Sequence, residues 1–257
     1  NLKLETNFDS GMKAIRLYYN PKLENLAFDL LGLAWRYAIN SKNSHVRQEV
    51  VQFLVEAAHS DREYIVSNAS RFLLDFSSAD FNTAAIDLLS AFTYQEDLAR
   101  DIIRVVGVAN LRSESVRLRQ VAELAHEDKT AHALYASKQW VALLVLSRFG
   151  EADSITKVLE QVKIEEDIIL RAGTLFKDLA YTQQPLSFDA LRGFLRSREP
   201  LPPLKINTLG WPESVYAAET LCEHTANFPM PTCHIREADL PKIIQWADAQ
   251  KQWGIRR

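Results

Sequence analysis

The most constraining feature of this chain is an apolar pattern that recurs about every 35 residues. Five segments align on one internal apolar position: RQEVVQFLVEA, NTAAIDLLSAF, RLRQVAELAHE, ADSITKVLEQV and SFDALRGFLRS. The aligned residues are Val51, Ile86, Val121, Ile155 and Leu191, and three positions later stand Leu54, Leu89, Leu124, Val158 and Phe194. Residues at i and i+3 share one face of a helix, so each segment is predicted to be a helix with one buried stripe.

Longer and more apolar segments alternate with these five. They cover residues 23–39, 62–76, 95–109, 131–149 and 164–180. Each is predicted to be a helix with a broad apolar face, and we call these the first helices and the five aligned segments the second helices. The connectors are short, which makes successive helices antiparallel neighbours. A sixth pair, spaced differently, is predicted at residues 212–224 and 240–253.

The predicted helices divide the chain into four parts. Residues 1–21 form a polar lead-in, residues 22–197 a repeat stack, residues 198–211 a proline-rich connector and residues 212–257 a C-terminal helix pair. One helix pair cannot bury its apolar face alone, whereas stacked pairs share a continuous core. We therefore predict an all-α fold, a right-handed α-solenoid of about five to six antiparallel helix pairs.

Two stretches, SHVRQEVVQFLVEAA and WVALLVLSRFGEADSITKVLEQV, resemble HEAT-like repeats of the armadillo superfamily. The resemblance extends over roughly residues 22–197. It implies a curved stack whose second helices line the concave face. Tetratricopeptide repeats have a similar period of 34 residues, but the Trp-Leu-Gly-Tyr pattern and the final proline that they require are not consistently present.

Charge and hydropathy limit the classes of partner. The formal net charge is −3, whereas nucleic-acid-binding proteins usually carry a basic surplus, so nucleic acid is disfavoured as a partner. No run of 18 apolar residues is present, and no membrane contact is expected. The longest apolar stretch, WVALLVLSRF, is predicted to be a buried helix. We expect a cytoplasmic location. The sequence shows no signal peptide, but its start at Asn1 also fits a processed product or a fragment of a longer polypeptide, so this absence says little about the compartment.

The sequence lacks the common catalytic motifs. It contains no nucleophile elbow, phosphate-binding loop or dinucleotide fingerprint, and we expect no catalytic residue, cofactor or metal. His126 and His132 are six residues apart, whereas zinc proteases need two histidines four apart, so we interpret them as part of a solvated cap or loop. The acidic residues Glu165, Glu166 and Asp167 are expected to stabilise a helix start through the helix dipole.

Two cysteines and two histidines lie close together near the C-terminus. Cys222, His224, Cys233 and His234 are residue types that zinc prefers, but their spacing does not match that of structural zinc sites. We favour a buried free thiol with surface histidines. A disulfide between the cysteines, which would staple the NFPMP loop in an oxidising compartment, and a metal site are the alternatives.

The five tryptophans fall into two groups. Trp35 and Trp140 lie within first helices and are predicted to be core residues. Trp211, Trp246 and Trp253 lie in the C-terminal part, where they either pack the last helix pair or anchor a partner.

Charged residues of the second helices are the candidates for partner binding. We select Arg117, Glu123, Lys157, Arg192 and Arg196, and the alternative interpretation is that they lie on solvated helical faces. The expected function is that of a non-catalytic protein-binding solenoid, either an adaptor, a scaffold or an immunity-type inhibitor. It would dock a partner protein on the concave second-helix face.

The alternative function is that of an enzyme on the same scaffold. Some alkylpurine DNA glycosylases resemble HEAT-like stacks of similar length and use a basic groove, an acidic residue and aromatic side chains. This chain supplies arginine and tryptophan, but its net negative charge argues against a DNA-binding groove.

Overall fold

A computed structural model describes residues 2–92, 99–124, 130–199 and 211–256. The regular secondary structure of these residues is helical, as the repeat predicts, and they contain no strand beyond an isolated bridge between Thr225 and Ile255. None of the helices in these ranges has the length and hydropathy needed to cross a bilayer. The chain has two compact units, unit 1 (Asn1–Leu124) and unit 2 (Ala125–Arg257). Their boundary falls inside the segment 22–197 that the sequence suggests is one stack.

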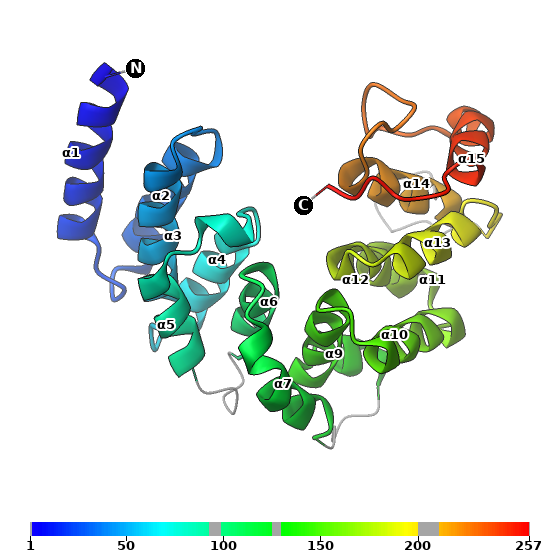
Figure 1. Cartoon of the computed structure of the whole chain (residues 1–257), viewed down its shortest axis with the longest axis horizontal. Helices are drawn as coiled ribbons and strands as arrows, with labels where there is room; N and C mark the ends of the chain where they lie inside the picture. Colours follow the sequence, from blue (N-terminus) through cyan, green and yellow to red (C-terminus); the bar gives the residue numbers. More distant parts are fainter. Residues whose placement is uncertain (1, 93–98, 125–129, 200–210, 257) are drawn as a thin grey trace. The chain divides into compact units, whose positions relative to one another are not determined.

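Unit 1 consists of two rows of helices (Figure 1). Its helices are α1 (Leu2–Tyr18), α2 (Glu24–Ile39), α3 (Ser44–Ala58), α4 (Glu63–Leu73), α5 (Thr83–Ala91), α6 (Ala99–Val108) and α7 (Ser115–Ala122), with short 3-10 turns η1 (Ser78–Asp80) and η2 (Arg112–Glu114). In the first row α2 packs on α4 and α4 on α6, and in the second row α3 packs on α5. Contacts of α3 with α2 and α4 join the rows.

Unit 2 repeats this pattern of neighbours. Its elements are α8 (Ala131–Tyr135), α9 (Lys138–Arg148), α10 (Ala152–Ile164), α11 (Ile168–Leu170), the π-helix η3 (Arg171–Leu175), α12 (Phe176–Thr182), α13 (Pro185–Phe194), α14 (Glu213–His224), the 3-10 turn η4 (Glu237–Asp239) and α15 (Leu240–Asp248). In the first row α9 packs on α12 and α12 on α14. In the second row α10 packs on α13 and α13 on α15.

The aligned apolar positions fall where the repeat predicts. One lies in each of α3, α5, α7, α10 and α13; four of these residues are buried and Ile86 is half-buried. At the next position of the stripe, Leu54, Leu89 and Val158 are buried and Phe194 is half-buried. Leu124 is 50% exposed, because α7 ends at Ala122 and no longer holds the side chain on its buried face. The stripe is therefore buried at seven of its ten positions, half-buried at Ile86 and Phe194, and exposed at Leu124.

The expected polar lead-in contains a helix. α1 carries a sparse apolar stripe of Phe8, Met12 and Ile15, whose spacing of three to four residues places them on one helix face. All three side chains are buried, and α1 packs on α2. The few apolar residues of a polar segment are sufficient to attach it to the unit.

Two of the predicted first helices are interrupted. The segment 131–149 breaks at Ser137, whose side chain accepts a hydrogen bond from the backbone N–H of Trp140 and caps α9. α9 itself is buried on almost every side, as predicted for WVALLVLSRF. The segment 164–180 contains the π-helix η3, and Asp167 caps the helix start before it by accepting from two backbone N–H groups, as expected.

Helix boundaries in this protein have local chemical causes. Gly150 has a φ of +89° and ends α9 in a left-handed conformation, which glycine adopts without steric cost. Ser44 and Asp61 are residue types whose side chains can cap a helix start, but neither is the cap of α3 or α4. Asn43 caps α3, because its side chain accepts from a backbone N–H within the first turn, and α4 follows Arg62 without any side-chain cap.

The favoured interpretation of the cysteines as free thiols is wrong. Cys222 and Cys233 form a disulfide with a Cα–Cα distance of 5.4 Å. Cys222 lies in the last turn of α14, and the chain returns to it because Ile235, two residues after Cys233, is buried in the core of unit 2. In the described part of the chain, no group of three or more metal-ligating side chains comes together.

The tryptophans mostly pack within the units. Trp140 is buried, as predicted, whereas Trp35 is only half-buried and stacks on Phe72 with ring centroids 5.4 Å apart. Trp246 and Trp253 contact each other, with centroids 5.8 Å apart, and pack against the core of unit 2. Of the five, Trp211 is the exposed one.

Candidate functional site

In unit 1 the predicted site residues are Arg117 and Glu123. Arg117 donates to the backbone carbonyls of Ser90 (2.9 Å) and Phe92 (2.5 Å) and pairs with Glu114 at 2.8 Å. The two carbonyls are at the C-terminal end of α5, where helical partners are missing, so the arginine caps that helix. Glu123 is exposed at the end of α7.

In unit 2 the predicted site residues are Lys157, Arg192 and Arg196. Lys157 is exposed on α10. Arg196 pairs with Asp248 at 2.6 Å, and Arg192 donates to the backbone carbonyl of Ala247 at 3.5 Å. Arg192 in α13 and Arg196 just after it thereby connect this part of the chain to the C-terminal end of α15. The five predicted residues thus lie in two different units, and their three arginines already have partners within the protein.

A buried charged cluster in unit 2 was not predicted. The Arg171 side chain, in η3, binds both carboxylate oxygens of Glu213 and lies 3.0 Å from a carboxylate oxygen of Glu199. The hydrogen bond to Glu213 is the main reason that the pKa of Arg171 is raised. Glu199 and Glu213 flank residues 200–210, and the backbone N–H of Glu213 donates to the Glu199 carbonyl at 3.0 Å. Arg171 therefore joins the two ends of that segment.

The same cluster continues to Tyr135. Its hydroxyl donates to the Glu165 carboxylate at 2.7 Å and accepts from the Gln161 amide at 3.0 Å. Burial and the bond to Glu165 raise the pKa of Tyr135 to about 12. The phenol is therefore protonated at neutral pH and serves as a donor that fixes Glu165. These bonds satisfy buried polar groups, so we interpret the cluster as a structural one.

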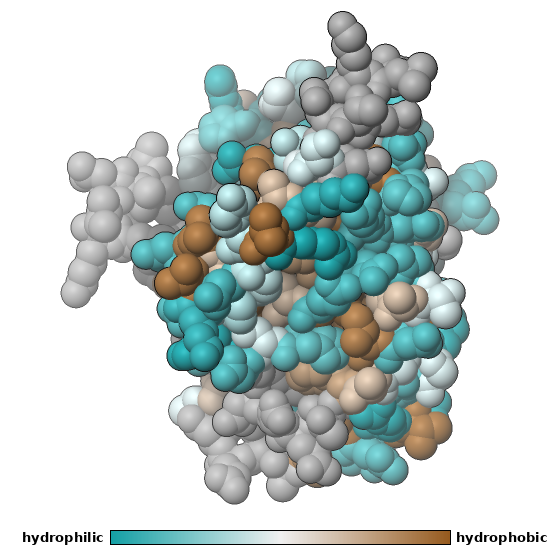
Figure 2. All heavy atoms as spheres, turned by 90° about the vertical axis from the view of Figure 1, so that its left-hand side faces the viewer, coloured by the Kyte–Doolittle hydropathy of each residue, from teal (hydrophilic) through white to brown (hydrophobic). Residues whose placement is uncertain are grey.

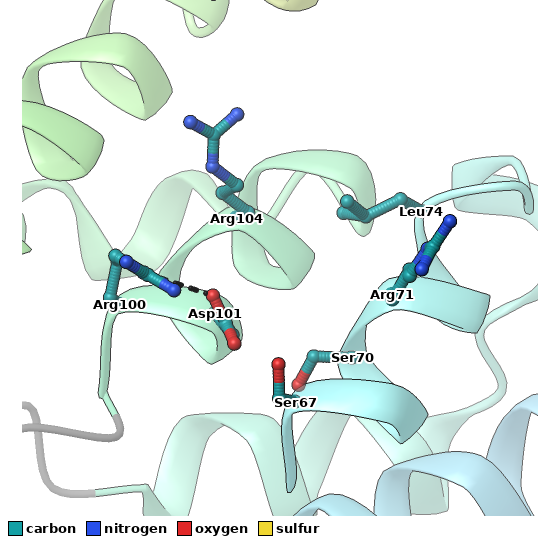
Figure 3. Close-up of a pocket in the computed structure, with 7 residues that line it drawn as sticks. All are labelled: Ser67, Ser70, Arg71, Leu74, Arg100, Asp101 and Arg104. Carbon is teal, nitrogen blue, oxygen red and sulfur yellow. Dashed lines mark hydrogen bonds and ion pairs between the residues drawn. The ribbon is translucent and has the colours of Figure 1, made fainter. Parts of the chain in front are cut away.

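A pocket of about 210 Å³ lies between α4 and α6 of unit 1 (Figure 3). Three arginines, one carboxylate, two hydroxyls and one leucine line it. These residues are Ser67, Ser70, Arg71 and Leu74 from α4 and its C-terminal end, and Arg100, Asp101 and Arg104 from α6. Both helices contribute arginines to the pocket, and such a lining is suited to binding an anion.

The arginines reach the pocket because of the strong amphipathicity of α6. Four of its apolar residues are completely buried; they are Ile102, Ile103, Val105 and Val106. The remaining face carries Arg100 and Arg104, one turn apart, and Asp101 to the pocket lining. Arg100 pairs with Asp101 at 3.1 Å, as the dashed line in Figure 3 marks.

The floor of the pocket contains an unusual hydroxyl. Ser70 is 1% exposed, and its Oγ has no hydrogen-bond partner. A buried polar group without a partner costs about 1–3 kcal/mol, and few are found in proteins. Ser67, one turn earlier, is exposed at the rim together with Arg71. Figure 3 shows both hydroxyls on the α4 side.

Sequence reasoning missed this pocket because it searched the second helices for basic residues, and α4 and α6 are first helices. The available signal was the spacing of Arg100 and Arg104, which are four residues apart in the predicted first helix 95–109. The contribution of Arg71, about 30 residues earlier, follows only from the packing of α4 on α6.

Exposed apolar side chains do not supply a rival site on the face seen in Figure 2. On this side of unit 1, apolar spots are separated by hydrophilic residues. Among the described residues of unit 1, the most exposed large apolar ones are Leu17 (77%) and Tyr18 (65%), at the end of α1. Scattered apolar residues are normal on protein surfaces and do not by themselves indicate a binding site.

Comparison of the chain with family models, curated proteins and solved structures finds no match.

Proposed function

We propose that this protein is a non-catalytic binding module, a right-handed α-solenoid of the HEAT-like kind that docks a partner protein on its second helices. The observation that carries the proposal is the order of contacts within each unit. First helices pack on first helices and second helices on second helices, as in α9–α12–α14 and α10–α13–α15. Helix pairs stacked in this manner share a core and leave an extended face on each row, which repeat proteins use for binding.

The second row of unit 2 offers a charged face for docking. On α10, Lys157, Glu160 and Lys163 are exposed, while Val158 and Val162 are buried on the opposite side. Opposite charges interspersed on one helix favour a partner with complementary charges rather than an apolar one. Lys157 is the residue of the predicted set best placed for such contact, because its side chain is exposed on this face.

The test resolves which row the partner contacts. The full chain is immobilised, used to capture proteins from a lysate of the cells that encode it, and treated with an amine-reactive crosslinker before mass spectrometry. Lys157 on α10 and Lys177 on α12 are both exposed, one on each row of the same unit. We expect the partner to crosslink to Lys157, and we expect Lys157→Glu but not Lys177→Glu to weaken capture.

Two results would contradict the proposal in different ways. Crosslinks at Lys177, together with loss of capture in Lys177→Glu, would indicate that the partner docks on the first row instead of the second. Recovery of no protein at any salt concentration would argue against the binding function itself.

A further inference from the structure

We propose that the pocket between α4 and α6 binds a phosphate monoester. This site lies on first helices of unit 1 and does not depend on the docking of a protein by the second row. A free phosphorylated small molecule and a phosphorylated side chain both present this group. The experiment below separates the two sources.

The charge of the lining residues matches this ligand. Arg71, Arg100 and Arg104 bring three guanidinium groups to the lining, and Asp101 brings one carboxylate. A phosphate monoester carries a charge of roughly −1.5 to −2 at neutral pH. Guanidinium groups bind phosphate oxygens through paired hydrogen bonds, and here they come from two facing helices.

The hydroxyls point to a ligand with several acceptor oxygens. The buried Oγ of Ser70 has no acceptor within the protein, although it lines the pocket. A phosphate oxygen at the floor of the pocket would accept its proton, and Ser67 would donate to a second oxygen. The unpaired hydroxyl then becomes a binding group that is satisfied when the ligand is present.

The shape of the site favours an ester over the free ion. The floor at Ser70 is buried, whereas Leu74 at the rim is 36% exposed. A monoester would place its oxygens at the floor and its organic group at the mouth, against the exposed Leu74 side chain.

Substitution of Asp101 should change the affinity for phosphate in the opposite direction from substitution of a lining arginine. Its carboxylate repels a bound anion, and its pairing with Arg100 only partly offsets this. Asp101→Asn removes one negative charge from the lining, so this variant should bind the phosphate monoester more tightly than the natural protein does. A cluster with a purely structural role would not give this gain.

The binding test uses calorimetric titration of the full chain with O-phospho-L-serine, and with serine and sulfate as comparison ligands. We expect O-phospho-L-serine to bind and serine not to bind. Arg104→Gln and Ser70→Ala should each weaken binding roughly tenfold or more, since each removes a hydrogen bond to a charged group. Arg36→Gln, at an exposed position of α2 outside the pocket, makes the same change of charge and should leave affinity unchanged.

A thermal melt separates binding from folding. Without ligand, Ser70→Ala should unfold at the same temperature as the natural protein or higher, because it removes a buried group that has no partner. The rise in melting temperature that O-phospho-L-serine gives the natural protein should be lost in this variant.

The source of the phosphate is resolved by a phosphoserine-containing peptide. Tighter binding of the peptide than of O-phospho-L-serine would support a phosphorylated protein, and equal binding would support a small phosphorylated molecule. The proposal is overturned if O-phospho-L-serine fails to bind, if sulfate binds equally well, or if Arg36→Gln weakens binding as much as Arg104→Gln. Displacement of O-phospho-L-serine by a short DNA duplex would also overturn it, in favour of a nucleic-acid site.

Discussion

At the scale of single residues, burial decides how much an ion pair contributes. Arg171 is 9% exposed and faces Glu213, which is 1% exposed, whereas both partners of the Arg196–Asp248 pair are about half exposed. Arg171→Met should lower the free energy of unfolding by about 3–5 kcal/mol, because it leaves the Glu213 charge buried without a partner. Arg196→Met should cost about 0–1 kcal/mol. Urea denaturation followed by circular dichroism measures both.

A double variant tests the cause of that loss. Glu213→Leu added to Arg171→Met removes the unpaired carboxylate and should recover a large part of the stability. Equal losses for Arg171→Met and Arg196→Met would show that burial does not govern these pairs.

Asp80 should make unit 1 sensitive to acid. Burial raises the pKa of this carboxyl group, but hydrogen bonds from Arg47 (2.6 and 2.8 Å) and Ser77 (2.8 Å) outweigh burial, and the net pKa lies below the ordinary 3.8. Because the folded pKa is lower than the unfolded one, the stabilisation is present above about pH 4 and is lost as the pH falls through the folded pKa.

The melting temperature as a function of pH checks this expectation. Relative to the natural protein, Asp80→Asn should melt at a lower temperature at neutral pH and show a shallower decline below pH 4. Asp29→Asn, an exposed position of α2, serves as the control and should follow the natural curve. If the melting temperature of Asp80→Asn fell below pH 4 as steeply as that of the natural protein, Asp80 would not be the source of the acid sensitivity.

The limits of sequence reasoning at this scale are clear from the arginines. The sequence shows that Arg117 and Arg196 lie on helices, and it suggests that they are available to a partner. In the fold, Arg117 binds backbone carbonyls that are 25 and 27 residues away in the sequence, and Arg196 binds a carboxylate that is 52 residues away. The sequence alone does not show these contacts. Only packing brings such groups together, so whether these side chains are paired within the protein could not be predicted.

At the scale of helices, periodicity predicts existence better than boundaries. The stripe at Val51 and its counterparts predicts α3, α5, α7, α10 and α13, because burial of one face is repeated in each. The break at Ser137 was not predicted, since the apolar pattern continues through it and a single side-chain cap interrupts the helix. Prediction of the pocket would also have required the knowledge that α4 and α6 are neighbours.

The disulfide connects α14 to the segment that follows it and should stabilise unit 2. Cys222 and Cys233 close a loop with a sequence separation of 11, for which chain entropy predicts about 3 kcal/mol. Replacement of both cysteines by serine should lower the free energy of unfolding by about this amount, measured by urea denaturation under non-reducing conditions.

A thiol assay provides the direct check on the disulfide. The natural protein, unfolded without reductant, should show no reactive thiol, and two after reduction. Two reactive thiols before reduction would restore the free-thiol interpretation.

At the scale of the whole molecule, the sequence predicts the fold class but not the division into units. The apolar pattern recurs across the boundary between Leu124 and Ala125 with nearly the same spacing as elsewhere, so it contains no sign of a boundary. The boundary between the units reflects how few contacts join residues on its two sides. The apolar repeat describes each helix locally and does not specify contacts between distant residues.

The net charge of the whole molecule sets an expectation for DNA. A chain with a formal charge of −3 and one described pocket lined by arginines should not bind a DNA duplex measurably at low salt. Fluorescence anisotropy of a labelled duplex, titrated with protein at several salt concentrations, measures this. Non-specific DNA binding depends on the release of counterions, and its slope against the logarithm of salt is about −0.9 per phosphate neutralised.

If any DNA binding is seen, the slope of its salt dependence distinguishes a protein-binding module from a glycosylase-like enzyme. The α4–α6 pocket is lined by three arginines, so weak binding through it should give a slope no steeper than about −3 and should disappear in Arg104→Gln. A slope of about −5 or steeper that persists in Arg104→Gln would require a basic surface elsewhere on the chain. That result would favour the glycosylase-like alternative over a protein-binding module, because only an extended groove contacts so many phosphates at once.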